Sequence, residues 1–236
     1  MTGKGDGTVT TTSADLRLAR VAARRLAVAL RAGRCPTDAT FDRFLPAPLQ
    51  DLSPRYWTPL AVIKRASEWL DGLDIQSVAD IGSGAGKFCV AGALFSRCRF
   101  IGLERSPSLV ASARRLARLF GVDDRVRFDC GALGETSTPV ADAYYFFNPF
   151  DDHSWELTDW ETSIPRNGGR HLGDVVVAEE LLRGAPRGTC VLTYNGFGGR
   201  IPESYRLIRI DLAFTGGLRL WRKDNDLRLL SFRKAQ

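Results

Sequence analysis

The sequence of 236 residues lacks several features that would place it in a special class of protein. It contains no apolar run of membrane-spanning length and no recognisable hydrophobic segment of a secretory signal. Its five cysteines are odd in number, and no two of them have C-x-x-C spacing. We therefore expect reduced thiols in a cytoplasmic protein, without a disulfide framework or a zinc site.

Histidine is also scarce, because the chain holds only His153 and His171. Both lie within residues 151–171, where Asp151 and Asp152 precede His153, and no second cluster of metal ligands accompanies them. We therefore predict no metal site. The histidines are interpreted either as surface residues without a role or as candidates for a general base.

Acidic residues are few in the first 34 positions, which hold seven cations and two anions. The formal net charge of the whole chain is +6, so this segment carries most of the excess and the remainder is almost neutral. A basic chain raises the question of nucleic acid. Because the excess lies on an N-terminal extension, we regard a nucleic-acid partner as less favoured than a small molecule or a protein side chain.

The N-terminal region is expected to differ from the rest of the chain. Residues 1–12 are rich in Gly and Thr and are predicted to be disordered. Ser13 is a suitable N-cap for a basic helix to about residue 32, whose arginine face suits solvation, nucleic acid, an anionic membrane or a transit segment. Residues 35–56 contain four prolines and are predicted to be largely irregular. The predicted organisation is a disordered tail (1–12), a basic helix and proline-containing linker (13–54) and a main domain (55–236).

Strands and helices alternate through the main domain, which predicts a parallel sheet with right-handed crossovers. The expected strands are 77–81, 98–103, 125–129, 141–147 and 189–194. The expected helices are 59–70, 87–96, 107–120 and 174–183. The segment 205–232 predicts two or three antiparallel strands, with one turn at residues 215–217.

A glycine turn follows the first of these strands, with Gly82, Gly84 and Gly86 at alternate positions. Such glycines permit positive φ and close approach of the backbone to a ligand, and the next helix begins directly after them. The turn does not fit a P-loop, because Ile81 replaces its first glycine and Phe88 its hydroxyl residue. It fits a dinucleotide fold poorly, because Lys87 stands where that fold has its third glycine.

Two acidic residues frame the glycine turn. Asp80 precedes it, where a carboxylate would repel a pyrophosphate but suits a ligand with an ammonium group. Glu104 ends the following strand, where a carboxylate can accept hydrogen bonds from a ribose diol. With these residues the sequence resembles the class I S-adenosylmethionine-dependent methyltransferases over roughly residues 55–232.

The resemblance implies a Rossmann-like α/β fold with a mostly parallel seven-stranded sheet and antiparallel C-terminal strands, and the N-terminal helical extension predicted above precedes it. It implies that Asp80 organises the methionine end of S-adenosyl-L-methionine, that the glycines pass beneath the cofactor, and that Glu104 holds the ribose. Many members have an acid after a glycine that follows the third strand and contact adenine with it, but here Ala132 follows Gly131. The cofactor-binding residues expected on this basis are Trp57, Thr58, Asp80, Gly82, Ser83, Gly84, Gly86, Glu104 and Arg105.

The best candidates for the substrate edge follow the fourth predicted strand. Asn148-Pro149-Phe150 is similar to the Asn/Asp-Pro-Pro-Tyr/Phe motif of enzymes that methylate amino groups, shortened by one proline. The resemblance makes Asn148 and Phe150 candidate catalytic residues, whereas the structural alternative has Asn148 capping a loop and Phe150 in the core. Trp57 and Thr58 are expected to cover the cofactor or, alternatively, to pack on the start of a helix.

These features together predict a methyltransferase that uses S-adenosyl-L-methionine, with an unidentified acceptor. A small molecule or a protein amino group is the favoured acceptor. The alternative from a different class is a catalytically inactive cofactor- or partner-binding protein on the same fold. An NAD-dependent oxidoreductase is a more distant alternative, and the oligomeric state is not encoded in any pattern that we identify.

Overall fold

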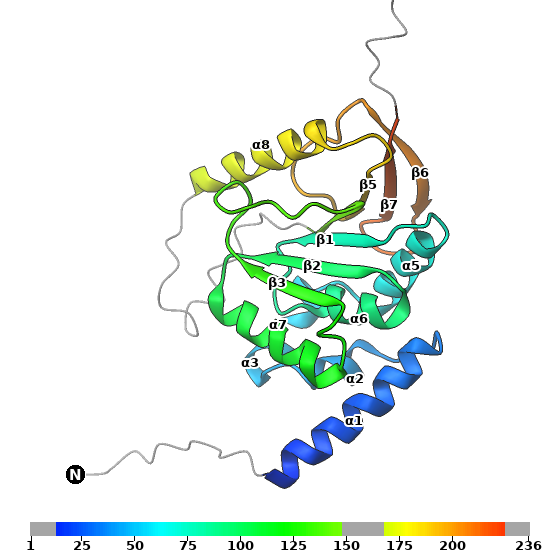
Figure 1. The fold of residues 1–236 in the computed structure, drawn as a ribbon, viewed down its shortest axis with the longest axis vertical. Coiled ribbons are helices and arrows are strands. Elements are labelled where there is room, and N and C mark those ends of the chain that lie inside the picture. Colours follow the sequence, from blue (N-terminus) through cyan, green and yellow to red (C-terminus); the bar gives the residue numbers. More distant parts are fainter. Residues whose placement is uncertain (1–12, 148–167, 225–236) are drawn as a thin grey trace, which may run out of the picture.

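A seven-stranded sheet is the centre of the computed structural model, which describes residues 13–147 and 168–224 (Figure 1). The strand order is β3-β2-β1-β4-β5-β7-β6. The strands are β1 (Ser77–Ile81), β2 (Arg99–Glu104), β3 (Val126–Cys130), β4 (Ala143–Phe147), β5 (Cys190–Tyr194), β6 (Tyr205–Asp211) and β7 (Leu218–Lys223).

The first five strands are parallel, and β7 runs antiparallel between β5 and β6. The chain order reverses between β1 and β4, which lie side by side although β2 and β3 intervene in the sequence. Such a reversal opens a crevice at the carboxyl ends of the strands. The predicted fold class is confirmed, and the glycine turn directly follows β1, beside this reversal.

Helices cover both faces of the sheet, as Figure 1 shows. The main helices are α1 (Ser13–Arg31), α5 (Leu60–Asp71), α6 (Lys87–Phe95), α7 (Pro107–Phe120) and α8 (Gly168–Gly184). Buried residues of α1, α5, α6 and α7 form one core with the sheet, and α8 forms a second core on the other face through Ala178 and Leu182. Alternate residues of β4 serve the two cores: Tyr145 points into the first, and Tyr144 and Phe146 into the second.

The segment predicted to be irregular, residues 35–56, contains three short helices, so that prediction was wrong. They are α2 (Asp38–Asp42), α3 (Ala47–Gln50) and α4 (Ser53–Tyr56). Prolines lie at the first turns of α3 and α4, where the backbone N–H that proline lacks has no helical partner. Phe41, Leu45 and Leu49 of this segment are buried in the first core. The division of the chain at residue 55 stays a prediction, and the core is continuous across it.

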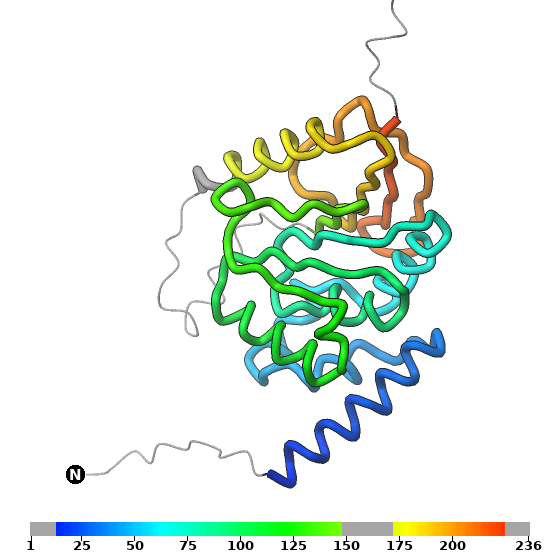
Figure 2. Tube along the Cα trace, in the orientation of Figure 1, coloured from blue at the N-terminus to red at the C-terminus, as the bar shows by residue number. Residues whose placement is uncertain are grey.

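Local capping signals set the limits of α7, which leads away from the site. Ser106 Oγ accepts a hydrogen bond from the Leu109 amide at 3.3 Å, and Gly121 ends the helix with φ of 64°. Residues 107–120 therefore form the helix that the sequence predicted. The chain trace in Figure 2 shows α1 lying next to the far end of α7, and the two helices are in contact.

Candidate functional site

The glycine turn adopts the backbone conformation for which glycine is needed. The φ angles of Gly82, Gly84 and Gly86 are 77°, 54° and 81°. The amides of Gly82 and Ser83 both donate to the carbonyl of Leu103, at 2.9 and 3.0 Å, which fixes the turn to the end of β2. Side chains other than glycine rarely adopt such angles, so the sequence is constrained by this turn.

The turn is also packed closely from both sides. A Cβ atom on Gly84 would lie 2.6 Å from Nε1 of Trp57, and one on Gly86 would lie 2.6 Å from the ring of Phe128. Trp57 therefore lies against the turn, and its predicted role as a cover for the cofactor stays a prediction. Trp57 belongs to the segment between α4 and α5, so the chain before the sheet forms one wall of the site.

Glu104 is held at the turn by two backbone amides. Its Oε2 accepts a hydrogen bond from Gly84 N–H and its Oε1 accepts one from Ser106 N–H, both at 2.9 Å. The first of these amides belongs to the glycine turn and the second to the start of α7. The carboxylate is therefore fixed in place between β1 and β2, where the sequence predicted an acid for a ribose.

Asp80 lies fully buried beneath the same turn. Burial raises the pKa of its carboxyl group from 3.8 to about 7, and the nearby charge of Glu104 adds to this rise. The thiol of Cys89 on α6 lies 3.4 Å from Asp80 Oδ2 and opposes the rise by donating a hydrogen bond. A cation beside Asp80 would favour its ionised form, so this carboxyl group is suited to an ammonium group.

The side chain of Thr58 is buried and contacts β4. Its hydroxyl shares a 2.7 Å hydrogen bond with Tyr145 Oη, and Tyr145 stacks on Phe88 with ring centroids 3.6 Å apart. Tyr145 is fully buried, and burial raises the pKa of its hydroxyl well above its usual value. The Thr58–Tyr145 contact thus joins the N-terminal wall to β4, which ends at the predicted substrate edge.

Lys87 is the first residue of α6 and is almost completely buried. Its Nζ lies 2.7 Å from Asp38 Oδ1, 2.8 Å from Asp42 Oδ1 and 3.1 Å from Ser53 Oγ. Asp38 also accepts a hydrogen bond from the Leu60 amide at 2.8 Å, at the start of α5. The lysine therefore ties α2, α4 and α5 to the helix that follows the glycine turn.

The remaining predicted site residues are Arg105, Asn148 and Phe150. The side chain of Arg105 is directed to α8, where its Nη2 lies 2.7 Å from Asp174 Oδ2. Asn148, Phe150 and His153 lie outside the described residues, so their predicted roles stay predictions. Phe147, the last residue of β4, packs on Tyr194 at the end of β5, with ring centroids 5.0 Å apart.

Sequence reasoning missed three parts of the site. Cys89 as a partner of Asp80 gives no local signal, because an apolar helix commonly contains a buried thiol. Tyr145 was included only as a strand residue. Lys87 did give a signal, since it is the single charge in the otherwise apolar segment 87–95. That signal predicts a buried charge, although it does not predict its partners.

The residues around the turn fit the predicted cofactor. Asp80 offers a carboxyl group whose charged form needs a cation, and Glu104 offers acceptors at the end of β2. Ser83 Oγ is buried and has no hydrogen-bond partner within residues 13–147 and 168–224. Over these same residues no group of three or more potential metal ligands is found, and no helix has the length and apolarity of a membrane span.

The relatives that comparison with known proteins identifies match only part of the chain. No protein-family model matches the chain. Ribosomal protein L11 methyltransferases of two Pectobacterium species, P. carotovorum and P. atrosepticum, are 29% identical to it over 110 residues. This match covers 45% of the chain and 36% of each relative, so the chain spans about a third of their length.

Solved structures resemble a larger part of the chain. An RNA methyltransferase from Salinibacter ruber, in complex with S-adenosyl-L-homocysteine, has a TM-score of 0.50 and 23% identity, covering 72% of this chain and 95% of that one. An O-methyltransferase from Bacillus cereus, also in complex with S-adenosyl-L-homocysteine, has a TM-score of 0.53 and 12% identity, covering 87% and 100%. At these identities the likeness concerns the fold. Together with the strand order, it shows that the chain has the Rossmann-like fold of the class I S-adenosylmethionine-dependent methyltransferases.

Proposed function

We propose that the protein is a methyltransferase that uses S-adenosyl-L-methionine and transfers a methyl group to an unidentified acceptor. The observation that carries this proposal is the arrangement of Asp80, the glycine turn and Glu104 at the carboxyl ends of β1 and β2. The curated relatives that match part of the chain are methyltransferases, which supports the proposal.

Each residue of the site has a role in this proposal. Asp80 binds the ammonium group of the methionine end in its ionised form. The glycine turn passes beneath the cofactor, and Glu104 accepts hydrogen bonds from the ribose. Trp57 lies against the turn, where it excludes water from one side of the site. Cys89 positions Asp80 by its hydrogen bond.

When bound, S-adenosyl-L-methionine supplies an electrophilic methyl group on its sulfonium. The chain contributes alignment and exclusion of water, with no covalent intermediate on the protein. Asn148 and Phe150 are proposed to lie at the acceptor, because β4 ends one residue before Asn148. We favour a small molecule or a protein amino group as the acceptor.

Calorimetry with S-adenosyl-L-methionine and its demethylated product tests the cofactor assignment. We expect both to bind the wild-type protein, Asp80→Asn to weaken binding of both, and the matched surface change Asp123→Asn to leave it unchanged. Absence of binding by the wild type would contradict the proposal, and binding of NAD instead would favour an oxidoreductase.

Transfer of a labelled methyl group to fractions of a cell lysate tests the activity. Label in the metabolite or protein fraction is the expected result, and it should be lost with Asp80→Asn. Cofactor binding without transfer to metabolite, protein or nucleic-acid fractions would instead support the inactive binding protein.

A further inference from the structure

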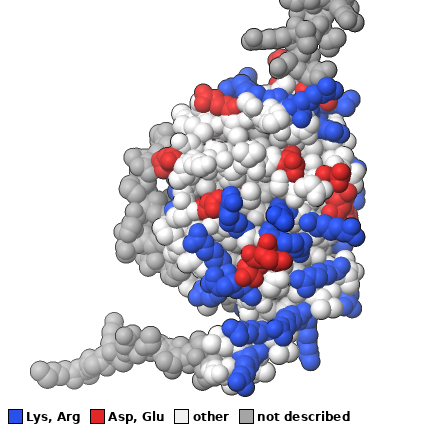
Figure 3. Space-filling model, viewed as in Figure 1, with Lys and Arg blue, Asp and Glu red and all other residues white. Residues whose placement is uncertain are grey.

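Seven arginines lie exposed on two neighbouring helices, far apart in the sequence. Together we name them the α1–α7 arginine strip: Arg17, Arg20, Arg24 and Arg31 on α1, and Arg114, Arg115 and Arg118 on α7. Figure 3 shows blue Lys and Arg atoms predominating over the part of this face where α1 and α7 lie. The strip thus combines the basic N-terminal helix with a helix of the main domain.

The arginines of α1 are on the side of that helix that adjoins α7. Spacings of three, four and seven residues place them on one side of a helix. Arg31 Nη2 lies 3.5 Å from the carbonyl of Gly121, the residue that ends α7, and so identifies which side this is. On α7, the opposite face is buried, so its three arginines are turned to the surface.

The strip has little charge compensation. Asp15 is the only acid of α1, and α7 has none. Within the part of the chain that the structure describes, none of the seven arginines forms an ion pair with an acid. Like charges at adjacent helical positions repel one another, so an anionic partner that neutralises them would bind favourably.

A hollow beside the strip favours a single polyanionic chain over a flat anionic surface as the partner. It has a volume of about 530 Å³ and is lined by Arg114 and Arg118 of the strip, by Arg127, and by two acids. The acids are Asp123 and Asp129, of which Asp129 pairs with Arg127 at 3.1 Å. The hollow has three arginines against two acids, and Arg114 donates from Nε and Nη2 to the carbonyl of Phe128 at 3.2 and 2.6 Å. Its net charge is positive, and guanidinium groups bind phosphate through paired hydrogen bonds.

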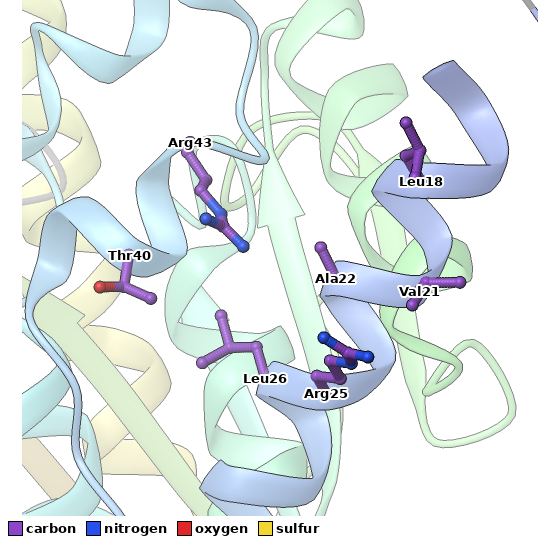
Figure 4. A pocket seen from close by; sticks show the side chains of 7 residues that line it. All are labelled: Leu18, Val21, Ala22, Arg25, Leu26, Thr40 and Arg43. Carbon is purple, nitrogen blue, oxygen red and sulfur yellow. The ribbon is translucent and has the colours of Figure 1, made fainter. Parts of the chain in front are cut away.

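The exposed apolar side chains of α1 do not form one face of the helix. Leu18 and Val21 line a separate groove of about 540 Å³ that faces α2, with Arg25 and Arg43 (Figure 4). A helix that lies on a membrane buries its apolar face in the lipid. Val21 and Val28 each lie three or four residues from two arginines of the strip, and Leu18 lies beside Arg25 in the groove. The exposed surface of α1 therefore has no purely apolar face, which disfavours a membrane as the partner of the strip.

We propose that the α1–α7 arginine strip binds the phosphodiester backbone of a nucleic acid. The proposal is independent of methyl transfer, since it concerns a surface that contains no residue of the cofactor site. It also differs from the expectation based on charge along the sequence, because the contact of α1 with α7 adds arginines of the main domain to those of the extension.

The test is fluorescence anisotropy of labelled single-stranded RNA, and of DNA of the same sequence, titrated with the full chain at several salt concentrations. The test variant replaces Arg20, Arg24 and Arg115 by Gln. The control variant makes the same change in charge at Arg187, Arg206 and Arg222, near the opposite edge of the sheet. All six are exposed, and circular dichroism verifies that both variants fold.

We expect the wild type and the control variant to bind, and the strip variant to bind at least tenfold more weakly. If each replaced arginine contacts one phosphate, the slope of log K against log salt should fall by about 2 for a single strand. Equal binding of RNA and DNA would assign the contact to the backbone, and preferred binding of RNA would add contacts to its 2′-hydroxyl groups.

Three results would overturn the proposal. The first is no binding of either strand by the wild type. The second is an equal loss in both variants, which would show an effect of net charge alone. The third is binding to vesicles containing an anionic phospholipid without binding to RNA or DNA, which would assign the surface to a membrane.

Discussion

The buried carboxyl group of Asp80 leads to a prediction that separates stability from binding. In Asp80→Asn an isosteric amide replaces a group that is neutral in the folded protein at low pH but ionises near pH 7. The amide oxygen can still accept the hydrogen bond from Cys89. The substitution therefore removes an ionisation while it preserves the packing.

The sign of the effect follows from the direction of the pKa change. The folded-state pKa of Asp80 is about 7, against 3.8 for an ordinary aspartate. Between these values the unfolded chain releases the proton and the folded protein retains it, so the free energy of unfolding falls as the pH rises. The stability that the retained proton of Asp80 contributes is fully present below about pH 4 and is lost above about pH 7.

The magnitude follows at about 1.4 kcal/mol for each pKa unit. Raising the pH from 5 to 8 should lower the stability of the wild type, relative to Asp80→Asn, by about 3 kcal/mol. Other groups titrate alike in both proteins and cancel in the comparison. Asp80→Asn should therefore gain stability over the wild type at pH 8, although it loses cofactor affinity.

Urea unfolding of both proteins at pH 5 and pH 8, without cofactor, measures the stability difference. Calorimetry supplies the second measurement, since cofactor affinity of the wild type should rise about tenfold from pH 6 to pH 8 if only ionised Asp80 binds. A stability difference that stays constant to within about 1 kcal/mol between the two pH values would refute the reasoning.

Three further substitutions test the packing of the site by urea unfolding. Gly84→Ala should lower the free energy of unfolding by about 1–3 kcal/mol more than Gly121→Ala does. Both glycines have positive φ, but only a Cβ on Gly84 would meet an indole ring. Equal losses of stability would contradict this contact. Lys87→Met should cost about 3–5 kcal/mol by leaving a buried carboxylate unpaired, whereas the exposed pair lost in Lys64→Met should be worth under about 1 kcal/mol. Tyr145→Phe should cost about 1 kcal/mol, the value of its hydrogen bond to a threonine, and an unchanged stability would show that this bond contributes nothing.

Local sequence patterns were sufficient to predict an element where the residues that cause it lie within one short segment. Ser106 and Gly121 mark the ends of α7 by capping, and three glycines mark a turn that needs positive φ. Parallel strands that are buried on both faces are continuous in apolar residues, so β1 and β5 were found with boundaries within one residue of those observed.

Prediction failed where the outcome depended on contacts between distant segments. Four prolines indicated irregular structure over residues 35–56, yet three of them lie at helix starts and the segment contributes Phe41 to the core. Likewise the guanidinium of Arg105, which directly follows Glu104, pairs with Asp174 of α8, a partner that no sequence pattern indicates. Its predicted contact with the cofactor stays a prediction. Neighbouring positions at a strand end can point to different elements, and sequence spacing does not reveal which.

The sequence by itself determined the ligand class of the site, because Asp80, the glycine turn and Glu104 lie within 25 residues of one another and each requirement is local. Only the tertiary structure decided what surrounds them. It paired Asp80 with Cys89, placed Trp57 against Gly84 and joined Lys87 to the N-terminal helices. It also brought α1 beside α7, so that charges separated in the sequence form one surface. Burial and proximity, which set the pKa of Asp80 and the charge of that surface, are properties of the folded chain.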